Sequence, residues 1–398
     1  MKQKFAPKKV ISYLVVIIFA ILFLYFGNMY ASQPDILDFN DDFESQSVRA
    51  TVINILDVYN DESEWWQGTI ILFDAEITSG EDAGSVVRVR QYLDDFFSFE
   101  EHGVSIGDNV LLQNFGYEWH FIELIRINMV VILGIIFVIL LLLFGRLKGL
   151  SAILSLGFTC TAIFAVFIPS IISGMNIYIS AIIVCIFSIV VTLFIINGVN
   201  KKSLAAVLGC MGGVLGAGII TLIMNNFLRL TGILDSESIH LLNIPTEHMI
   251  DLRALIFAGI IIGASGAIMD VSVSISSALW ELKEQAPKMR FRKYYRSGIN
   301  IGRDIMGSMA NTLVLAYIGS SLSVILLLIV YSENLTDLLN REMVIVELLQ
   351  AIVGSLGILL AIPLTALTCA AFFSKKRTSP TVKNDEQNQT VQSSNTSQ

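Results

Sequence analysis

Two carboxylates lie where carboxylates are rare, beside or within long apolar stretches of the sequence. Asp270 lies inside the apolar run 254–279, and Asp304 lies directly before the run 305–331. A charged side chain in the middle of a bilayer costs about 3 kcal/mol on insertion scales, and such residues commonly mark the path of a proton, an ion or a substrate. Asp270 follows Arg253 by 17 residues, or about 26 Å of helix. This spacing predicts that Asp270 lies in the last third of a hydrocarbon core about 30 Å thick.

Small and polar residues share the helical face that holds Asp270. At about 3.6 residues per turn, this face collects Gly259, Gly263, Gly266, Ala267, Asp270, Ser274, Ser277 and Glu281. A second polar face begins the next run and holds Asn300, Asp304, Gly307, Ser308 and Asn311, with Arg303 beside it. The two runs are consecutive and antiparallel. We therefore expect the two faces to meet, with Arg303 near enough to neutralise one carboxylate.

These residues have two interpretations. The first is a buried network of ion pairs and hydroxyls that fixes the register of two helices. The second is a path for a proton, a cation or a substrate. The residues of that path are Asp270, Ser274, Ser277, Asn300, Arg303, Asp304, Ser308 and Asn311.

An enzymatic interpretation fits the motifs poorly. Intramembrane aspartyl proteases also place one aspartate on each of two neighbouring helices, but in YD and GxGD motifs. Here Asp270 follows Ile268-Met269, and Asp304 follows Gly302-Arg303. No phosphate-binding glycine loop and no CxxC spacing occur in the sequence. We therefore expect no enzyme, no cofactor and no metal site.

Membrane-spanning helices are the elements that must position these residues. Of the 398 residues, 54% are hydrophobic and 15% are charged, whereas soluble domains have about 25% charged residues. Each crossing needs roughly 20 apolar residues. The qualifying runs are 10–30, 127–144, 150–172, 177–196, 203–224, 254–279, 305–331 and 344–373. The first run exceeds the about 7–15 residues of a signal-peptide core, which favours an anchor helix. The sequence thus predicts an all-α polytopic membrane protein with about eight transmembrane helices.

Lysine and arginine predict how the chain is threaded, because positive residues stay on the cytoplasmic side. With both termini inside, the cytoplasmic segments hold 19 of these residues, and the short outer connections hold three, Arg229, Arg253 and Arg341. The basic N-terminus 1–9 is then cytoplasmic. The tail 374–398 is also cytoplasmic, and its many Asn, Gln, Ser and Thr residues predict disorder.

One large external segment, residues 31–126, precedes a seven-helix domain, 127–373. The external segment contains 20 acidic residues against four arginines and no lysine, a net charge of −16. Stretches rich in β-branched and aromatic residues, separated by turn clusters, predict a small extracytoplasmic β-domain. These stretches are 48–56, 69–78, 86–93 and 104–113. The strand count suits an OB-like barrel, a fold compatible with a sugar, a peptide or no ligand.

Glycines and basic residues indicate further contacts. The overlapping GxxxG spacings of the fifth run predict close helix packing through Gly209, Gly212, Gly213 and Gly216. We assign the same role to Gly259, Gly263 and Gly266. Such contacts also suit a homo-oligomer or a paralogous membrane partner. The connection from Lys283 to Arg296 interleaves six basic residues with aromatics, which favours anionic lipid headgroups over nucleic acid as its partner.

The signature region of a known family resembles part of this chain. The resemblance rests on the run from Gly263 to Glu281, then Ser297-Gly-Ile-Asn-Ile-Gly-Arg-Asp-Ile-Met-Gly, then Asn311-Thr-Leu-Val-Leu-Ala-Tyr-Ile-Gly319. These motifs are similar to those of the YibE/F family of bacterial multi-pass membrane proteins. The placement of the external β-segment resembles the longer, YibE-like members. The resemblance covers about residues 146–373 and implies a bacterial plasma-membrane protein, but it implies no substrate or catalytic residue.

Our leading hypothesis is a permease in which the sixth and seventh spans line a polar path. Asp270 would be the protonation or cation site, and Arg303, Asp304 and Asn311 would shape the path. The alternative is a non-transporting membrane scaffold, or a complex subunit, whose external β-domain binds an envelope component or a partner protein.

Overall fold

The computed structural model describes residues 7–31, 47–63, 66–94, 103–114, 118–244, 248–287, 289–331 and 334–374. The predicted disordered tail, apart from Ser374, lies outside these residues, as do residues 1–6 of the basic N-terminus. The chain divides into two compact units. One is Gln33–Ile153, and the other combines Met1–Ser32 with Leu154–Gln398.

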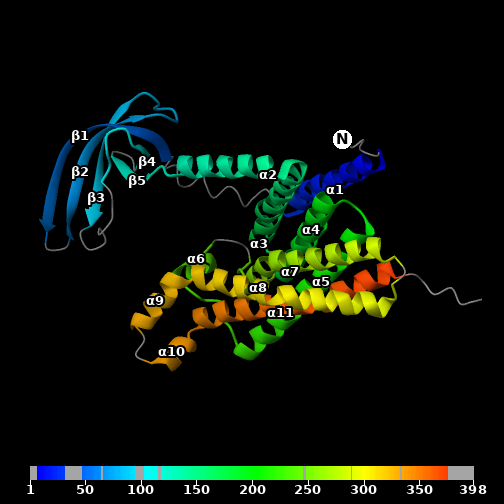
Figure 1. Cartoon of the computed structure of the whole chain (residues 1–398). Helices are drawn as coiled ribbons and strands as arrows, with labels where there is room; N and C mark the ends of the chain where they lie inside the picture. Colours follow the sequence, from blue (N-terminus) through cyan, green and yellow to red (C-terminus); the bar gives the residue numbers. More distant parts are fainter. Residues whose placement is uncertain are drawn as a thin grey trace, which may run out of the picture. The chain divides into compact units, whose positions relative to one another are not determined.

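The unit Gln33–Ile153 contains a closed β-barrel. Its described strands are β1 (Ser47–Ser63), β2 (Trp66–Ile77), β3 (Val86–Asp94), β4 (Asn109–Asn114) and β5 (Trp119–Leu124). They follow the order β1-β2-β3-β5-β4 around the barrel (Figure 1). β3 and β5 are parallel, and the other paired strands are antiparallel. Alternate residues of a strand face inward, so Val52, Phe73, Val89 and Val110 form a core in which each is at most 1% exposed.

The predicted β-domain is present, with differences at its edges. The predicted stretches correspond to β1 to β4, although β1 continues to Ser63 and β4 begins only at Asn109. The prediction missed β5. The six residues of β5 include His120 and Glu123, and their burial does not alternate along the strand, so the strand lacks the period-two signal on which the prediction relies.

A long apolar helical stretch, Ile127–Ile172, contains 46 residues. It consists of α2 (Ile127–Ala162), a π-helical segment (Ile163–Phe167) and α3 (Ile168–Ile172). The backbone of Arg146 leaves the helical region, with φ 49° and ψ −127°, and this breaks α2. A straight helix of this length would measure about 69 Å, more than twice the thickness of a bilayer core. The break lies between the predicted runs 127–144 and 150–172.

The other unit is a helical bundle (Figure 1). Its long described helices are α1 (Pro7–Ala31), α4 (Ile177–Asn197), α5 (Lys201–Leu228), α7 (Leu252–Gln285), α8 (Phe291–Ser320) and α11 (Glu342–Phe373). Shorter described helices are α6 (Ser236–Leu242), α9 (Leu322–Tyr331) and α10 (Leu335–Leu339). Within the described residues, six helices are long and apolar enough to cross a membrane, or up to seven if α8 and α9 together form one broken span. The chain is therefore a multi-pass membrane protein.

The predicted run 305–331 is not one straight helix. α8 begins at Phe291, ends at Ser320 and is followed by α9 at an angle of 62°. Gly319, Ser320 and Ser321 occupy the bend, and glycine–serine pairs are a common cause of kinks. α8 begins before the predicted apolar run because its first turns are basic and polar, and a search for apolar runs leaves such turns out.

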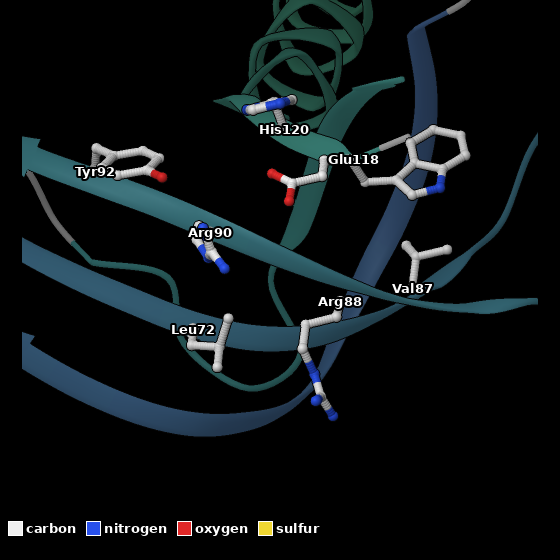
Figure 2. A pocket seen from close by; sticks show the side chains of 8 residues that line it. Leu72, Val87, Arg88, Arg90, Tyr92, Glu118 and His120 are labelled. Atoms are coloured by element: carbon white, nitrogen blue, oxygen red, sulfur yellow. The ribbon is translucent and has the colours of Figure 1, made fainter. Parts of the chain in front are cut away.

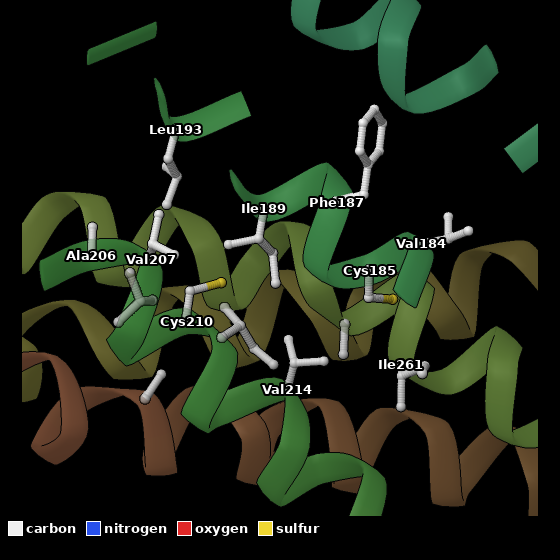
Figure 3. Packing of buried hydrophobic residues seen from close by; sticks show 14 of the residues in the cluster. Val184, Cys185, Phe187, Ile189, Leu193, Ala206, Val207, Cys210, Val214 and Ile261 are labelled. Carbon is white, nitrogen blue, oxygen red and sulfur yellow. The ribbon is translucent and has the colours of Figure 1, made fainter. Parts of the chain in front are cut away.

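Apolar side chains fill the space between the bundle helices. Figure 3 shows the part of this core where α4, α5 and α7 meet around Cys185, Cys210 and Ile261. Each of these side chains is at most 2% exposed, and all four cysteines of the chain are free thiols. α11 packs against α5, α7 and α8, and together with α7 it holds α8 on the bundle.

Candidate functional site

The face of α7 that holds Asp270, called the polar stripe below, lies on the surface of the bundle, away from the core. Asp251 caps the helix, because its Oδ1 accepts hydrogen bonds from the backbone N–H groups of Arg253 and Ala254, at 3.0 and 3.2 Å. The helical period then exposes Gly259, Gly263, Gly266, Asp270, Ser274 and Glu281, and leaves Ser277 half-buried.

The opposite side of α7 holds this orientation in place. Ile268, Val271, Ile275 and Leu279 are all 0% exposed. Rotation of the helix to bring Asp270 inward would break the close packing of these four side chains against the neighbouring helices, and such packing is what holds membrane helices together. Asp270 is therefore held at the surface.

The second polar face is exposed in the same way on α8. The exposed residues are Asn300, Arg303, Asp304, Ser308 and Asn311. Tyr294, Gly298, Gly302 and Leu313 form the buried side of this helix. The Ser308 hydroxyl has a hydrogen-bond partner within its own helix, since its Oγ donates to the Ile305 carbonyl oxygen at 3.0 Å.

α7 and α8 are antiparallel neighbours. A Cβ atom added at Gly298 would lie 3.0 Å from Leu279 Cδ1, and one added at Gly263 would lie 2.8 Å from the Tyr317 hydroxyl. These two contacts set the register, which places Asp270 level with the turn of α8 around Ser308.

The structure does not join the two polar faces by a direct bond. Two ion pairs of the described residues, Arg88–Asp74 and Arg126–Glu123, lie in the unit that contains the barrel, and neither involves the polar faces of α7 and α8. Arg303 thus pairs with neither Asp270 nor Asp304 in this conformation, contrary to the expected neutralisation. The reason is the direction in which α8 packs. Its small residues approach α11, where an added Cβ at Gly298 would lie 2.7 Å from the Ala366 Cβ.

The glycines predicted to pack do so on α5 but less uniformly on α7. On α5, Gly209, Gly212, Gly213 and Gly216 approach Thr365, Leu364, Ala361 and Leu360 of α11. On α7, Gly263 approaches Tyr317, but no heavy atom of the described chain lies within 4 Å of an added Cβ at Gly259 or Gly266. Gly266 lies about one turn before Asp270, and its small size leaves the surface beside that carboxylate open.

A buried hydrogen bond between the side chains of α7 and α11 was not predicted from the sequence. Thr365 of α11 donates from its Oγ1 to the Ser272 Oγ of α7 at 3.1 Å, and both residues are 0% exposed. Thr368 donates to the Ala205 carbonyl oxygen of α5 at 2.9 Å. Ser272 lies only two residues from Asp270, but it falls off the polar stripe, so the pattern of exposed residues carries no signal for it.

Tyr317 is a second residue that the site prediction omitted. Its hydroxyl is buried and has no hydrogen-bond partner in the described part of the chain. It lies where α8 approaches Gly263 of α7, close to Gln350 of α11. The motif from Asn311 to Gly319 contained this tyrosine, and a hydroxyl within an otherwise apolar stretch was the available signal.

The model of the family described as YibE/F-like protein matches residues 133–375. The chain belongs to the YibE/F family. No curated protein and no solved structure matches this YibE/F-like chain. The matched range includes both polar faces and α4 to α11, whereas the barrel lies before it. The resemblance seen in the sequence motifs is thus confirmed, and the candidate site lies within the part that defines the family.

Proposed function

We propose that this YibE/F-like protein is a membrane permease in which the polar faces of α7 and α8 line a path for a proton, a cation or a polar substrate. Asp270 carries the proposal. It lies exposed on the surface of an apolar bundle, and contact with hydrocarbon would cost it about 3 kcal/mol or more. Because the buried side of α7 keeps it from turning inward, Asp270 needs water or a polar partner.

The length of the stripe supports a path rather than a local lock. Glu281 follows Gly259 by 22 residues, so the stripe extends over about 33 Å of helix, close to the about 30 Å of a bilayer core. Small residues occupy its first half, and hydroxyls and carboxylates occupy the second. A network that only fixed the register of two helices would need polar residues over one or two helical turns, not over the whole length of the stripe.

Each polar residue has a role in this proposal. Asp270 exchanges the proton or binds the cation, and Asp304 with Arg303 sets the charge along the α8 side. The remaining residues supply hydroxyl and amide groups to the path; they are Ser274, Ser277, Asn300, Ser308 and Asn311.

The proposed threading has eight spans, both termini in the cytoplasm of a bacterial cell and the barrel outside the plasma membrane. The break at Arg146 supports two spans within Ile127–Ile172, and α8 with α9 counts as one broken span. The distribution of lysine and arginine supports the orientation. The strand order and the parallel pairing of β3 with β5 support an OB-like barrel.

Anionic lipid is the partner that we propose for the basic start of α8. Arg290, Arg292, Lys293 and Arg296 are exposed there. Positive charge at a helix N-terminus is unfavourable, by about 0.3–1 kcal/mol per residue, so these residues do not serve the helix itself. Lys283 differs, because its Nζ lies 4.4 Å from the centre of the Trp280 ring.

Proton flux in reconstituted vesicles tests the permease. Gradients of Na⁺, K⁺ and Mg²⁺ are imposed in turn, and an entrapped dye reports the internal pH. We expect at least one gradient to change the internal pH, and Asp270→Asn to abolish the change. Asp251→Asn is the matched control on the same helix, because asparagine also caps helices well. Equal flux in wild type and Asp270→Asn would remove Asp270 from the mechanism, and no flux in wild type would contradict proton or cation coupling.

The scaffold remains the second candidate, and the open surface beside Asp270 favours it as well. A second copy of the chain or another membrane protein would also shield that carboxylate. In this case mild solubilisation should recover a complex. If the barrel is the binding surface, deletion of residues 36–120 should abolish the complex while the bundle still folds. Recovery of the protein as a single chain would count against the scaffold.

A further inference from the structure

A pocket of about 520 Å³ lies on the outer surface of the barrel (Figure 2). Its lining comes from β2, from β3, from the start of β5 and from Glu118, which directly precedes β5. The volume falls within the range of about 300–1,000 Å³ that is usual for small-ligand sites. The pocket lies outside the range that defines the family, so its role is separate from the proposed path along α7 and α8.

The strand register aligns three of the lining residues in one row across the strands. Leu72 of β2 pairs with Arg90 of β3, and Arg90 pairs with His120 of β5. Arg90 and Tyr92 lie two residues apart and are both exposed, whereas the intervening Gln91 is buried, as the alternation of a strand requires. Arg90 is therefore at the centre of the pocket floor.

Charge within the pocket differs from charge in the rest of the external segment. Residues 31–126 hold only four arginines and no lysine, with a net charge of −16, yet two of the arginines line this pocket. Each has an acidic neighbour. Arg88 Nε lies 3.1 Å from Asp74 Oδ1. A hydrogen bond with Tyr92, and the nearby charge of Glu118, raise the pKa of the Arg90 guanidinium above its usual value.

These pairs leave the pocket close to neutral within an acidic domain. An anionic ligand such as a nucleic acid would have to overcome the negative field of the segment. A ligand with many hydroxyl groups would instead find donors on Arg90 and acceptors on Glu118. Tyr92 is 50% exposed, and Trp119 lines the pocket while packing against the barrel core. Two aromatic side chains thus offer apolar surface, the one on Trp119 held in place by the core.

We propose that this pocket binds a neutral oligosaccharide. Sugar rings would lie against Tyr92 and Trp119, and their hydroxyl groups would bond to Arg90 and Glu118. A hydroxyl group can accept a hydrogen bond from Arg90 and donate one to Glu118, whereas a phosphate or carboxylate would be repelled by Glu118. The proposal holds for either function of the bundle, because it concerns only the barrel.

To test this proposal, the full-length protein in lipid nanodiscs is applied to a printed array of neutral and acidic glycans, and binding to each glycan is measured. The best neutral glycan is then titrated by calorimetry. We expect neutral oligosaccharides to bind, and Arg90→Gln and Glu118→Gln each to weaken binding about tenfold or more, as expected for loss of a hydrogen bond to a charged group.

Matched controls are available on the same barrel. Arg49→Gln and Glu76→Gln change exposed residues of β1 and β2 that do not line the pocket, and they should leave binding unchanged. Thermal unfolding checks that all four variants remain folded. Absence of neutral glycan binding on the whole array, preference for acidic glycans, or equal affinity in Arg90→Gln and wild type would each overturn the proposal. None of these results would alter the proton flux expected of the bundle.

Discussion

Replacement of Gly213 with alanine tests whether α5, α7 and α11 pack as closely as the structure has them. An added Cβ would lie 2.8 Å from the Ala361 Cβ, 2.9 Å from Ile268 Cγ2 and 3.0 Å from the Gly357 carbonyl oxygen, and ordinary van der Waals contact begins at 3.4 Å. Ala361 and Ile268 are 0% exposed, and the third contact is backbone. No flexible chain end can move aside, so the helices themselves must separate.

The expected cost follows from two opposing terms. Overpacking of a well-packed core costs about 1–3 kcal/mol, and the better helix propensity of alanine returns up to about 1 kcal/mol. We expect Gly213→Ala to lower the free energy of unfolding by about 1–2 kcal/mol. The assay is reversible unfolding in mixed micelles, followed by circular dichroism.

Gly266→Ala is the matched control, since no described heavy atom lies within 4 Å of its added Cβ. This variant should be unchanged or stabilised by up to about 1 kcal/mol. Equal stability of the two variants, or a Gly213→Ala protein more stable than wild type, would refute the packing of these three helices.

Three smaller perturbations test other parts of the structure. Ser272→Ala and Thr365→Val should each destabilise the bundle, and a double-mutant cycle should give a coupling of about 0.5–1.5 kcal/mol; zero coupling would mean that their hydrogen bond is absent. Hydrogen bonds from Ser238 lower the pKa of Asp235, so the stabilisation of α6 by the Asp235 cap should be complete above the unfolded pKa of about 3.9 and be lost as the pH falls through the lower folded pKa. Hydrogen exchange of residues 236–242 would report this loss. Exchange in Asp235→Ala that matches wild type at neutral pH would contradict the cap. Arg88→Gln should change barrel stability by less than about 0.5 kcal/mol, because its side chain is 63% exposed; a loss above about 2 kcal/mol on thermal unfolding would show that the pair is structural.

Local periodicity is sufficient to predict the faces of the helices. Asp270 and Ser274 lie on one stripe because a helix repeats every 3.6 residues, and the apolar residues between them, such as Val271, face the core. The same reasoning finds the fifth run and its glycines. None of this requires knowledge of which helix packs against which.

Contacts between distant segments are what the sequence does not reveal. Gly298 and Gly302 pack α8 onto α11, and this pairing of helices turns the polar face of α8 outward. The pocket of the barrel depends on the alignment of Leu72, Arg90 and His120 across three strands. Strand register is set by pairing partners far apart in the chain, so a single sequence cannot supply it.

Cysteine-accessibility labelling tests the polar path most directly. Single cysteines are placed at each position of 259–281 and 300–311 in a cysteine-free background, and intact membranes are treated with a hydrophilic thiol reagent. We expect reactivity at every third or fourth residue, including position 270, and none at Ile268 or Val271. Protection along both polar faces would contradict a water-filled path, and it would shift the function of the protein to a scaffold.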